Sequence, residues 1–161
     1  MTILEADLTR PDHQAAVVAL TAAYGADPAG NGEPLAGDVL DRLIPGLRAL
    51  PTALILLAYQ GDEPVGIANC FVGFSTFKGK PLINIHDLAV LREHRGRGIG
   101  KALLTAVFAK AEAMGCCRVT LEVNEENRPA KTLYDKVGFE QAGKGSAIGG
   151  ALFYIKPIGP S

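Results

Sequence analysis

The sequence lacks an excess of charge of either sign. Its 161 residues include 16 Lys and Arg against 17 Asp and Glu, which gives a formal net charge of −1. Proteins that bind nucleic acid or an acidic membrane through bulk electrostatics carry a large positive charge. We therefore expect neither partner, and we interpret the local basic cluster at residues 92–101 as a ligand site.

Cysteine and long apolar runs are scarce as well. The three cysteines, Cys70, Cys116 and Cys117, do not have the spacing of a metal site, so we expect reduced core residues and no bound metal. No apolar run approaches the ~18 residues of a membrane span, and no basic stretch followed by an apolar one opens the chain. We expect a cytoplasmic protein with a single domain over residues 1–161.

The clearest pattern that is present lies at residues 83–139. An apolar, alternating segment at 83–90 predicts a strand, and a loop rich in Arg and Gly follows at 95–100. Apolar residues at helical spacing then predict a helix that Gly115 ends, and a second strand is predicted at 119–123. This unit should be a right-handed parallel crossover.

The Arg/Gly loop predicts a phosphate site. A glycine-rich turn that opens a helix leaves backbone N–H groups unpaired, and the helix dipole adds positive potential there. The loop is not a Walker loop, because Ala102 follows Gly100-Lys101 where that motif has Ser or Thr. It is not a Rossmann fingerprint either, because its glycines are spaced G-x-G-x-G.

The rest of the chain predicts strands and helices in mixed order. We expect a first helix capped by Thr9, a second helix bent or broken at Pro45-Gly46, and an antiparallel meander of strands at 52–59, 65–77 and 81–90. A loop at 143–150 should precede a last strand at 151–156. This order indicates an α+β fold with a mixed sheet.

Two segments together resemble a known family. The first is R-x-x-G-x-G at Arg95–Gly100, and the second is the set Asn127, Ala130, Leu133-Tyr134 and Gly138-Phe139. In this order they resemble the GCN5-related N-acetyltransferase (GNAT) superfamily. The resemblance implies a mostly antiparallel sheet of six to seven strands, a central splayed parallel strand pair and about four flanking helices. It also implies an N-acetyltransferase that uses acetyl-CoA and a primary amine acceptor and, by analogy with the family, a homodimer.

The resemblance assigns roles to individual residues. The backbone at residues 88–90 would pair with pantetheine, the loop would take the pyrophosphate, and Asn127, also a predicted helix N-cap, would contact the pantetheine arm. Tyr134 would protonate the leaving thiolate, because a phenol stays protonated at neutral pH. The expected cofactor-binding residues are Leu88, Ala89, Val90, Arg95, Gly96, Arg97, Gly98, Ile99, Gly100, Lys101, Asn127 and Tyr134.

The general base and the acceptor stay open at this point. Glu122, His86 and Asp87 are the candidate bases, and deprotonation relayed by water is an alternative. A non-catalytic CoA-binding or interaction module and a protein N-terminal or lysine acetyltransferase are alternative functions. One acidic run could form a pocket for a polyamine or an aminoglycoside, or only a solvated face; it consists of Asp27, Glu33, Asp38 and Asp41. Two aromatic residues near a turn, Phe74 and Phe77, could line an acceptor pocket, form an interface or only pack.

Overall fold

The computed structural model describes residues 1–142 and 150–159. The predicted loop at 143–150 lies outside the described residues except for its last residue. The elements follow one another as β1 (Thr2–Glu5), α1 (Pro11–Ala26), α2 (Gly37–Ala49), β2 (Ala53–Gln60), β3 (Glu63–Ser75), β4 (Lys80–Val90), the short 3₁₀ helix η1 (Arg92–His94), α3 (Ile99–Ala113), β5 (Arg118–Asn124), α4 (Arg128–Lys136), β6 (Glu140–Gln141) and β7 (Ala151–Pro157).

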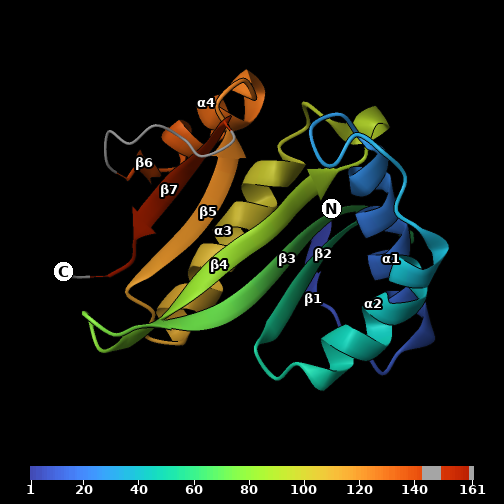
Figure 1. The fold of residues 1–161 in the computed structure, drawn as a ribbon, viewed down its shortest axis with the longest axis horizontal. Coiled ribbons are helices and arrows are strands. Elements are labelled where there is room, and N and C mark those ends of the chain that lie inside the picture. Colours follow the sequence, from blue (N-terminus) through green and yellow to red (C-terminus); the bar gives the residue numbers. More distant parts are fainter. Residues whose placement is uncertain (143–149, 160–161) are drawn as a thin grey trace.

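One mixed sheet organises these elements (Figure 1). Its strand order is β1-β2-β3-β4-β5-β7-β6, and every neighbouring pair is antiparallel except β4 and β5. The sheet and the helices confirm the predicted α+β fold with a central parallel pair.

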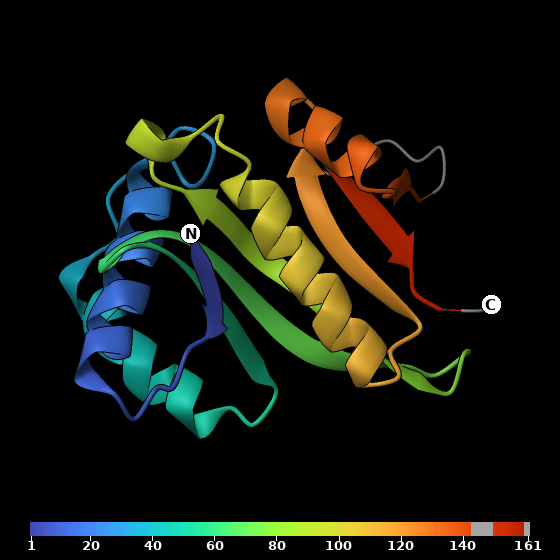
Figure 2. The ribbon, with the colours of Figure 1, turned by 180° about the vertical axis from the view of Figure 1, so that it is seen from behind.

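The two faces of the sheet carry separate hydrophobic cores. Residues of α3 and α4, such as Leu103 and Tyr134, share one core with strand residues. Val17 and Leu20 of α1 form the other core with strand residues, and α2 packs against it. Figure 2 shows α3 lying across one face of the sheet, with α1 and α2 beyond it. Strand β2, between β1 and β3, contributes alternate residues to both cores, as its apolar sequence predicts.

The parallel strands separate toward their carboxyl ends. β4 and β5 pair only where Ile83–Ile85 face Val119–Leu121, although β4 continues to Val90 and β5 to Asn124. Beyond Ile85, the edge of β4 that faces β5 therefore has no strand partner among the described residues. Figure 1 shows the two arrowheads diverging. The splayed pair is thus a property of this chain.

A β-bulge interrupts the alternation of β4. Asn69 of β3 pairs with Asp87, but Cys70 pairs with Ile85, so His86 is an extra residue in the ladder. Ile83 and Ile85 belong to the core under α3, and beyond the bulge Leu88 packs against that same core. Positions of odd number before the bulge and of even number after it therefore share a face. His86 and Asp87, although adjacent in sequence, both lie on the opposite face.

The structure overturns the predicted cap of α1 and, of the predicted bend or break in α2, the break. Thr9 does not cap α1, because the N-cap is Arg10 and the Thr9 hydroxyl instead donates to Asp7 Oδ1 at 2.7 Å. α2 is not broken at Pro45, which lies inside a continuous helix. The proline leaves the carbonyl of Asp41 without its intrahelical donor. Asp41 is exposed, so water can satisfy that carbonyl and the helix persists.

Candidate functional site

The loop before α3 presents uncapped backbone N–H groups. Gly96 and Gly98 have φ angles of 78° and 79°, a left-handed conformation that glycine adopts without steric cost. Gly98 is the N-cap of α3 and provides no side chain to occupy the first-turn N–H groups. A Cβ placed on Gly98 would meet nothing within 4 Å. The end of the helix is therefore open to an anionic ligand.

A cleft of about 550 Å³ lies next to this loop, where β4 and β5 separate. We call it the splay cleft. It is lined by most of the predicted site residues, namely Leu88, Ala89, Val90, Arg95, Gly96, Gly98, Ile99, Gly100, Lys101, Glu122, Asn127 and Tyr134. Arg97 is not among the lining residues, and its guanidinium lies 3.4 Å from His94 Nδ1. Residues from five separate segments of the chain thus meet at one site.

Tyr134 lies on α4 between two other aromatic rings. Its ring packs edge-on against Phe139 and Tyr154, at centroid distances of 5.6 Å and 6.1 Å. The residue is only 7% exposed, and this burial, with a smaller effect from Tyr24, raises the pKa of the phenol above its usual value. The hydroxyl therefore stays protonated at neutral pH and can act as a donor.

Asn127 and Glu122 lie where the sequence predicts. Asn127 caps α4, with its Oδ1 accepting a hydrogen bond from the Ala130 N–H at 3.3 Å. Glu122 is exposed between buried Leu121 and Val123, so its side chain is on the opposite face of β5. It follows Leu121, the last residue of β5 that pairs with β4, and it lines the splay cleft.

His86 and Asp87 line a different cleft, of about 510 Å³, between the helix pair α1–α2 and strands β3 and β4. We call it the helix-pair cleft. The bulge in β4 is what brings both adjacent side chains to it, because simple alternation would place them on opposite faces. The His86 ring packs edge-on against Phe71 at 5.8 Å. The structure thus separates these two candidate bases from Glu122.

Tyr24 lines both clefts, and sequence reasoning missed it. It lies in the last turns of α1, just before Gly25. Burial raises the pKa of Tyr24, and the charges of Asp87 and Asp27 raise it further. A single aromatic side chain near the end of an alanine-rich helix was the one signal that the sequence offered.

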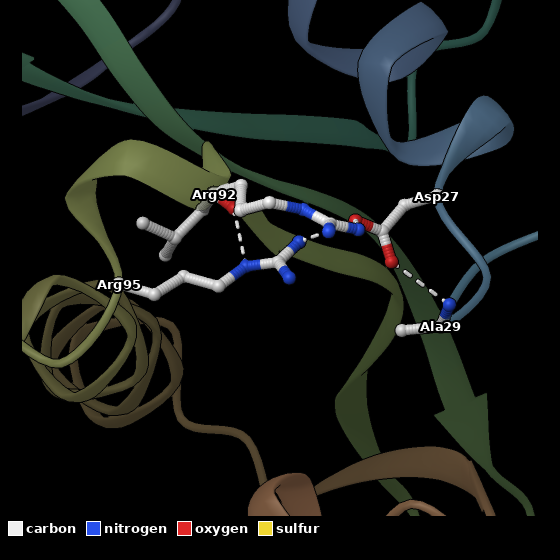
Figure 3. Close-up of polar contacts among 5 residues, drawn as sticks. Asp27, Ala29, Arg92 and Arg95 are labelled. Carbon is white, nitrogen blue, oxygen red and sulfur yellow. Dashed lines mark hydrogen bonds and ion pairs between the residues drawn. The ribbon is translucent and has the colours of Figure 1, made fainter.

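An ion pair joins the loop after α1 to the Arg/Gly loop (Figure 3). Asp27 Oδ2 lies 2.8 Å from Arg95 Nη2 and 3.5 Å from Arg92 Nη2, and Asp27 Oδ1 accepts the Ala29 N–H at 2.9 Å. Arg95 Nε also donates to the Val90 carbonyl at 3.0 Å. The Ala29 N–H and then Arg95 lower the pKa of Asp27. Arg95 therefore lines the splay cleft and also connects the loop after α1 to the end of β4.

We expect Asp27→Asn to lower the thermal midpoint at pH 7 by a few degrees. The pKa of Asp27 is lowered in the folded state, so its stabilisation is present above the unfolded pKa of ~4 and lost as the pH falls through the folded value. Scanning calorimetry should therefore show that the difference from the wild type shrinks toward ~pH 3.

Asp38→Asn is the matched control, because Asp38 pairs with Arg42 on an exposed helix face. A shift as small as that of the control would contradict the structural role of Asp27.

The acidic run lies outside the helix-pair cleft. None of Asp27, Glu33, Asp38 and Asp41 is among the residues that line the helix-pair cleft. Of the residues that line it, Asp87 is the one carboxylate.

The two aromatics near the turn lie away from both clefts. Phe74 and Phe77 are 62% and 101% exposed at the β3–β4 hairpin, and neither lines the splay cleft or the helix-pair cleft. Figure 2 shows this hairpin projecting beyond the body of the sheet.

The cysteines are unpaired, and Cys70 and Cys116 are buried. Burial, with a smaller effect from Asp87, raises the pKa of Cys70 to about 12, so its thiol is not a nucleophile at neutral pH. Within residues 1–142 and 150–159, no group of three His, Cys, Asp or Glu side chains is placed to hold a metal ion. No helix in this described part has the length and apolarity to cross a bilayer.

Comparison with known proteins adds three findings. A mouse (Mus musculus) protein named probable N-acetyltransferase family 8 member 5 is 40% identical over 70 residues, which is 44% of this chain and 31% of the relative. The chain thus spans about a third of that relative's length. A crystal structure of a probable acetyltransferase superposes with a TM-score of 0.80 at 19% identity, over 92% of this chain and 95% of the other. The NatC complex bound to Gag peptide and CoA contains a chain that superposes with a TM-score of 0.71 at 23% identity, over 99% of this chain and 100% of that one.

The sequence profile of the acetyltransferase (GNAT) family matches residues 21–139, which include the end of α1, both central parallel strands, the Arg/Gly loop and α4. This segment is most of the chain, and it contains the splay cleft. The chain therefore belongs to the GNAT family of acetyltransferases.

Proposed function

We propose that this protein is an N-acetyltransferase that transfers an acetyl group from acetyl-CoA to a primary amine, with residues 1–161 forming one catalytic domain. The observation that carries the proposal is the splay cleft. It combines an open helix N-terminus, an unpaired strand edge and a protonated tyrosine in one cavity of about 550 Å³. Membership of the GNAT family supports the same reaction class.

The residues of the splay cleft fit coenzyme A. The first-turn N–H groups of α3 and the Lys101 ammonium would hold its phosphates, in the open space beside Gly98. The free edge of β4 at Leu88–Val90 would pair with the amide-containing arm as a further strand does. Asn127, the N-cap of α4, lines the same cleft. When bound, acetyl-CoA supplies an acetyl group activated as a thioester.

The side chains around the cleft supply what acyl transfer needs. A neutral amine attacks the carbonyl carbon, so a C–N bond forms and the C–S bond breaks. N–H groups at the free edge of β4 would donate to the carbonyl oxygen as negative charge develops there. Tyr134 would give its proton to the departing sulfur, and the proton lost by the amine balances it. These roles remain our proposal for the residues.

Three residues compete for the proton of the amine. Glu122 lies in the splay cleft, whereas His86 and Asp87 lie in the helix-pair cleft. An acceptor that approaches from the helix pair meets His86 and Asp87 first. Transfer through water needs none of them, because an amine with a pKa near ~10 is neutral for a small fraction of the time.

Titration calorimetry with CoA, followed by a thiol-release assay with acetyl-CoA and a panel of primary amines, tests the proposal. We expect saturable CoA binding and amine-dependent release of free CoA. Binding without thiol release from any amine would indicate a non-catalytic CoA-binding module. No detectable binding of CoA would refute the assignment of the splay cleft.

A further inference from the structure

The guanidinium of Arg95 is held by two contacts where it lines the splay cleft (Figure 3). Its Nε donates to the Val90 carbonyl oxygen at 3.0 Å, and its Nη2 donates to Asp27 Oδ2 at 2.8 Å. A guanidinium is planar and has five N–H donors in a fixed arrangement, so contacts through two of its nitrogens fix its plane. Within residues 1–142 and 150–159, the third nitrogen, Nη1, makes no hydrogen bond. Its two N–H groups therefore remain for a ligand.

The carboxylate of Asp27 is itself fixed by the loop after α1. Its side chain is only 11% exposed, and its Oδ1 accepts the Ala29 N–H at 2.9 Å, which leaves Oδ2 for the arginine. The Asp27 carbonyl oxygen accepts the N–H groups of Gly30 and Gly32 at 2.9 Å and 3.0 Å. The Ala29 N–H and then Arg95 lower the pKa of Asp27, so it stays charged at neutral pH. The loop thus holds a negative charge in one place against Arg95.

Asp27 is not placed to bind a ligand of the splay cleft directly. It is not among the residues that line this cleft, whereas Arg95 is. A carboxylate would also repel a diphosphate, because the two groups carry charge of the same sign. Arg92, whose Nη2 lies 3.5 Å from Asp27 Oδ2, does not line the splay cleft either. The contact through which the charge of Asp27 acts on the splay cleft is therefore the one to Arg95.

We propose that Asp27 is a positioning residue for the cofactor, which holds the Arg95 guanidinium so that its free Nη1 N–H groups meet the diphosphate of coenzyme A. A long side chain that rotates freely loses conformational entropy when it binds a ligand, and a side chain that is already held avoids this cost. The loop after α1 thereby raises cofactor affinity without touching the cofactor. This inference depends on the proposed acetyltransferase function.

Asp27→Asn separates this role from the shape of the loop. The asparagine keeps an oxygen for the Ala29 N–H, but it presents an uncharged amide group to Arg95 in place of the charged Oδ2. If Asp27 positions Arg95, the variant binds CoA roughly three- to tenfold more weakly, which is the usual cost of ordering one long side chain. If Asp27 only repels the diphosphate, the variant binds CoA more tightly. Titration calorimetry with CoA, well below the thermal midpoint of the variant, gives the sign of the effect.

A second measurement compares two acetyl donors with the same amine in the thiol-release assay. S-Acetylpantetheine carries the same thioester as acetyl-CoA but no diphosphate. We expect Asp27→Asn to raise the KM for acetyl-CoA roughly three- to tenfold with kcat unchanged, and to leave kcat/KM for S-acetylpantetheine unchanged. Dephospho-CoA keeps the diphosphate and lacks the 3′-phosphate, so calorimetry should show that it loses as much affinity for the variant as CoA does.

Two controls show whether the effect passes through Arg95. Asp38→Asn removes a carboxylate that pairs with Arg42 on an exposed face of α2, and it should change none of these quantities. Arg95→Met removes every donor of the guanidinium. In that background, Asp27→Asn should change CoA affinity less than twofold, because the two residues act as one unit.

The outcomes separate this inference from the function on which it depends. An unchanged or raised CoA affinity in Asp27→Asn would overturn the inference and leave the acetyltransferase standing. Equal losses for acetyl-CoA and S-acetylpantetheine, an unchanged affinity for dephospho-CoA, or the full loss in the Arg95→Met background would overturn it in the same way. No CoA binding by the wild-type protein would refute the proposed function, and the inference with it.

Discussion

Tyr134→Phe is expected to lower kcat by more than tenfold while CoA binding survives. Burial keeps the phenol of Tyr134 protonated, and its hydroxyl is the proton donor that we propose for the leaving thiolate. General acid catalysis typically contributes 10²- to 10⁴-fold, so removing one oxygen atom should act on turnover rather than on ground-state binding. Steady-state kinetics by thiol release, with titration calorimetry for CoA, gives both numbers.

Tyr154→Phe is the matched control for this variant. Tyr154 is also a buried tyrosine, only 3% exposed, and its ring contacts that of Tyr134, but it does not line the splay cleft. Both changes remove a hydroxyl from the same aromatic cluster. If Tyr134→Phe turned over as fast as Tyr154→Phe, the proton donor would have to be a different group.

Gly98→Val is expected to weaken CoA binding by more than tenfold. Gly98 has a φ of 79°, where an L side chain costs about 1–2 kcal/mol and a β-branched one more. A Cβ at Gly98 points into open space at the N-terminus of α3, the place that we assign to the phosphates. The side chain would thus occupy the anion site in addition to straining the turn. Titration calorimetry with CoA measures the loss.

The other end of the same helix provides the control. Gly115 has a φ of 72°, and a Cβ there also meets nothing within 4 Å, but it follows the C-cap of α3. Gly115→Val should lower the thermal midpoint about as much as Gly98→Val does and leave CoA affinity unchanged. Tight CoA binding by folded Gly98→Val would remove the loop from the binding site.

Much of the splay cleft could be predicted because its residues follow local rules. Gly98 and Asn127 sit at helix starts, where backbone conformation and capping leave few residue choices. Glu122 alternates with buried neighbours on β5, so its face follows from sequence spacing. The parallel crossover then brings these local features to one edge of the sheet. The GNAT resemblance predicts that these features belong to one site.

The helix-pair cleft could not be predicted because it depends on long-range packing. The apolar residues of α1 are spread around the helix, so periodicity does not say that Val17 and Leu20 face the sheet or that Tyr24 reaches the clefts. The contact between Asn69 and Thr21 joins residues 48 positions apart. No local pattern marks an asparagine in an apolar strand as a residue that lines a cleft.

The extra residue His86 changes which residues of β4 face each side of the sheet. Before it the odd-numbered residues of β4 face α3, and after it the even-numbered residues do, so one strand contributes residues to both clefts. Deleting His86 would restore the regular alternation of side chains along β4. Leu88 would keep its place against the core under α3, because Asp87 would become the single residue between Ile85 and Leu88, and the helix-pair cleft would have one polar side chain of β4 where it now has two adjacent ones.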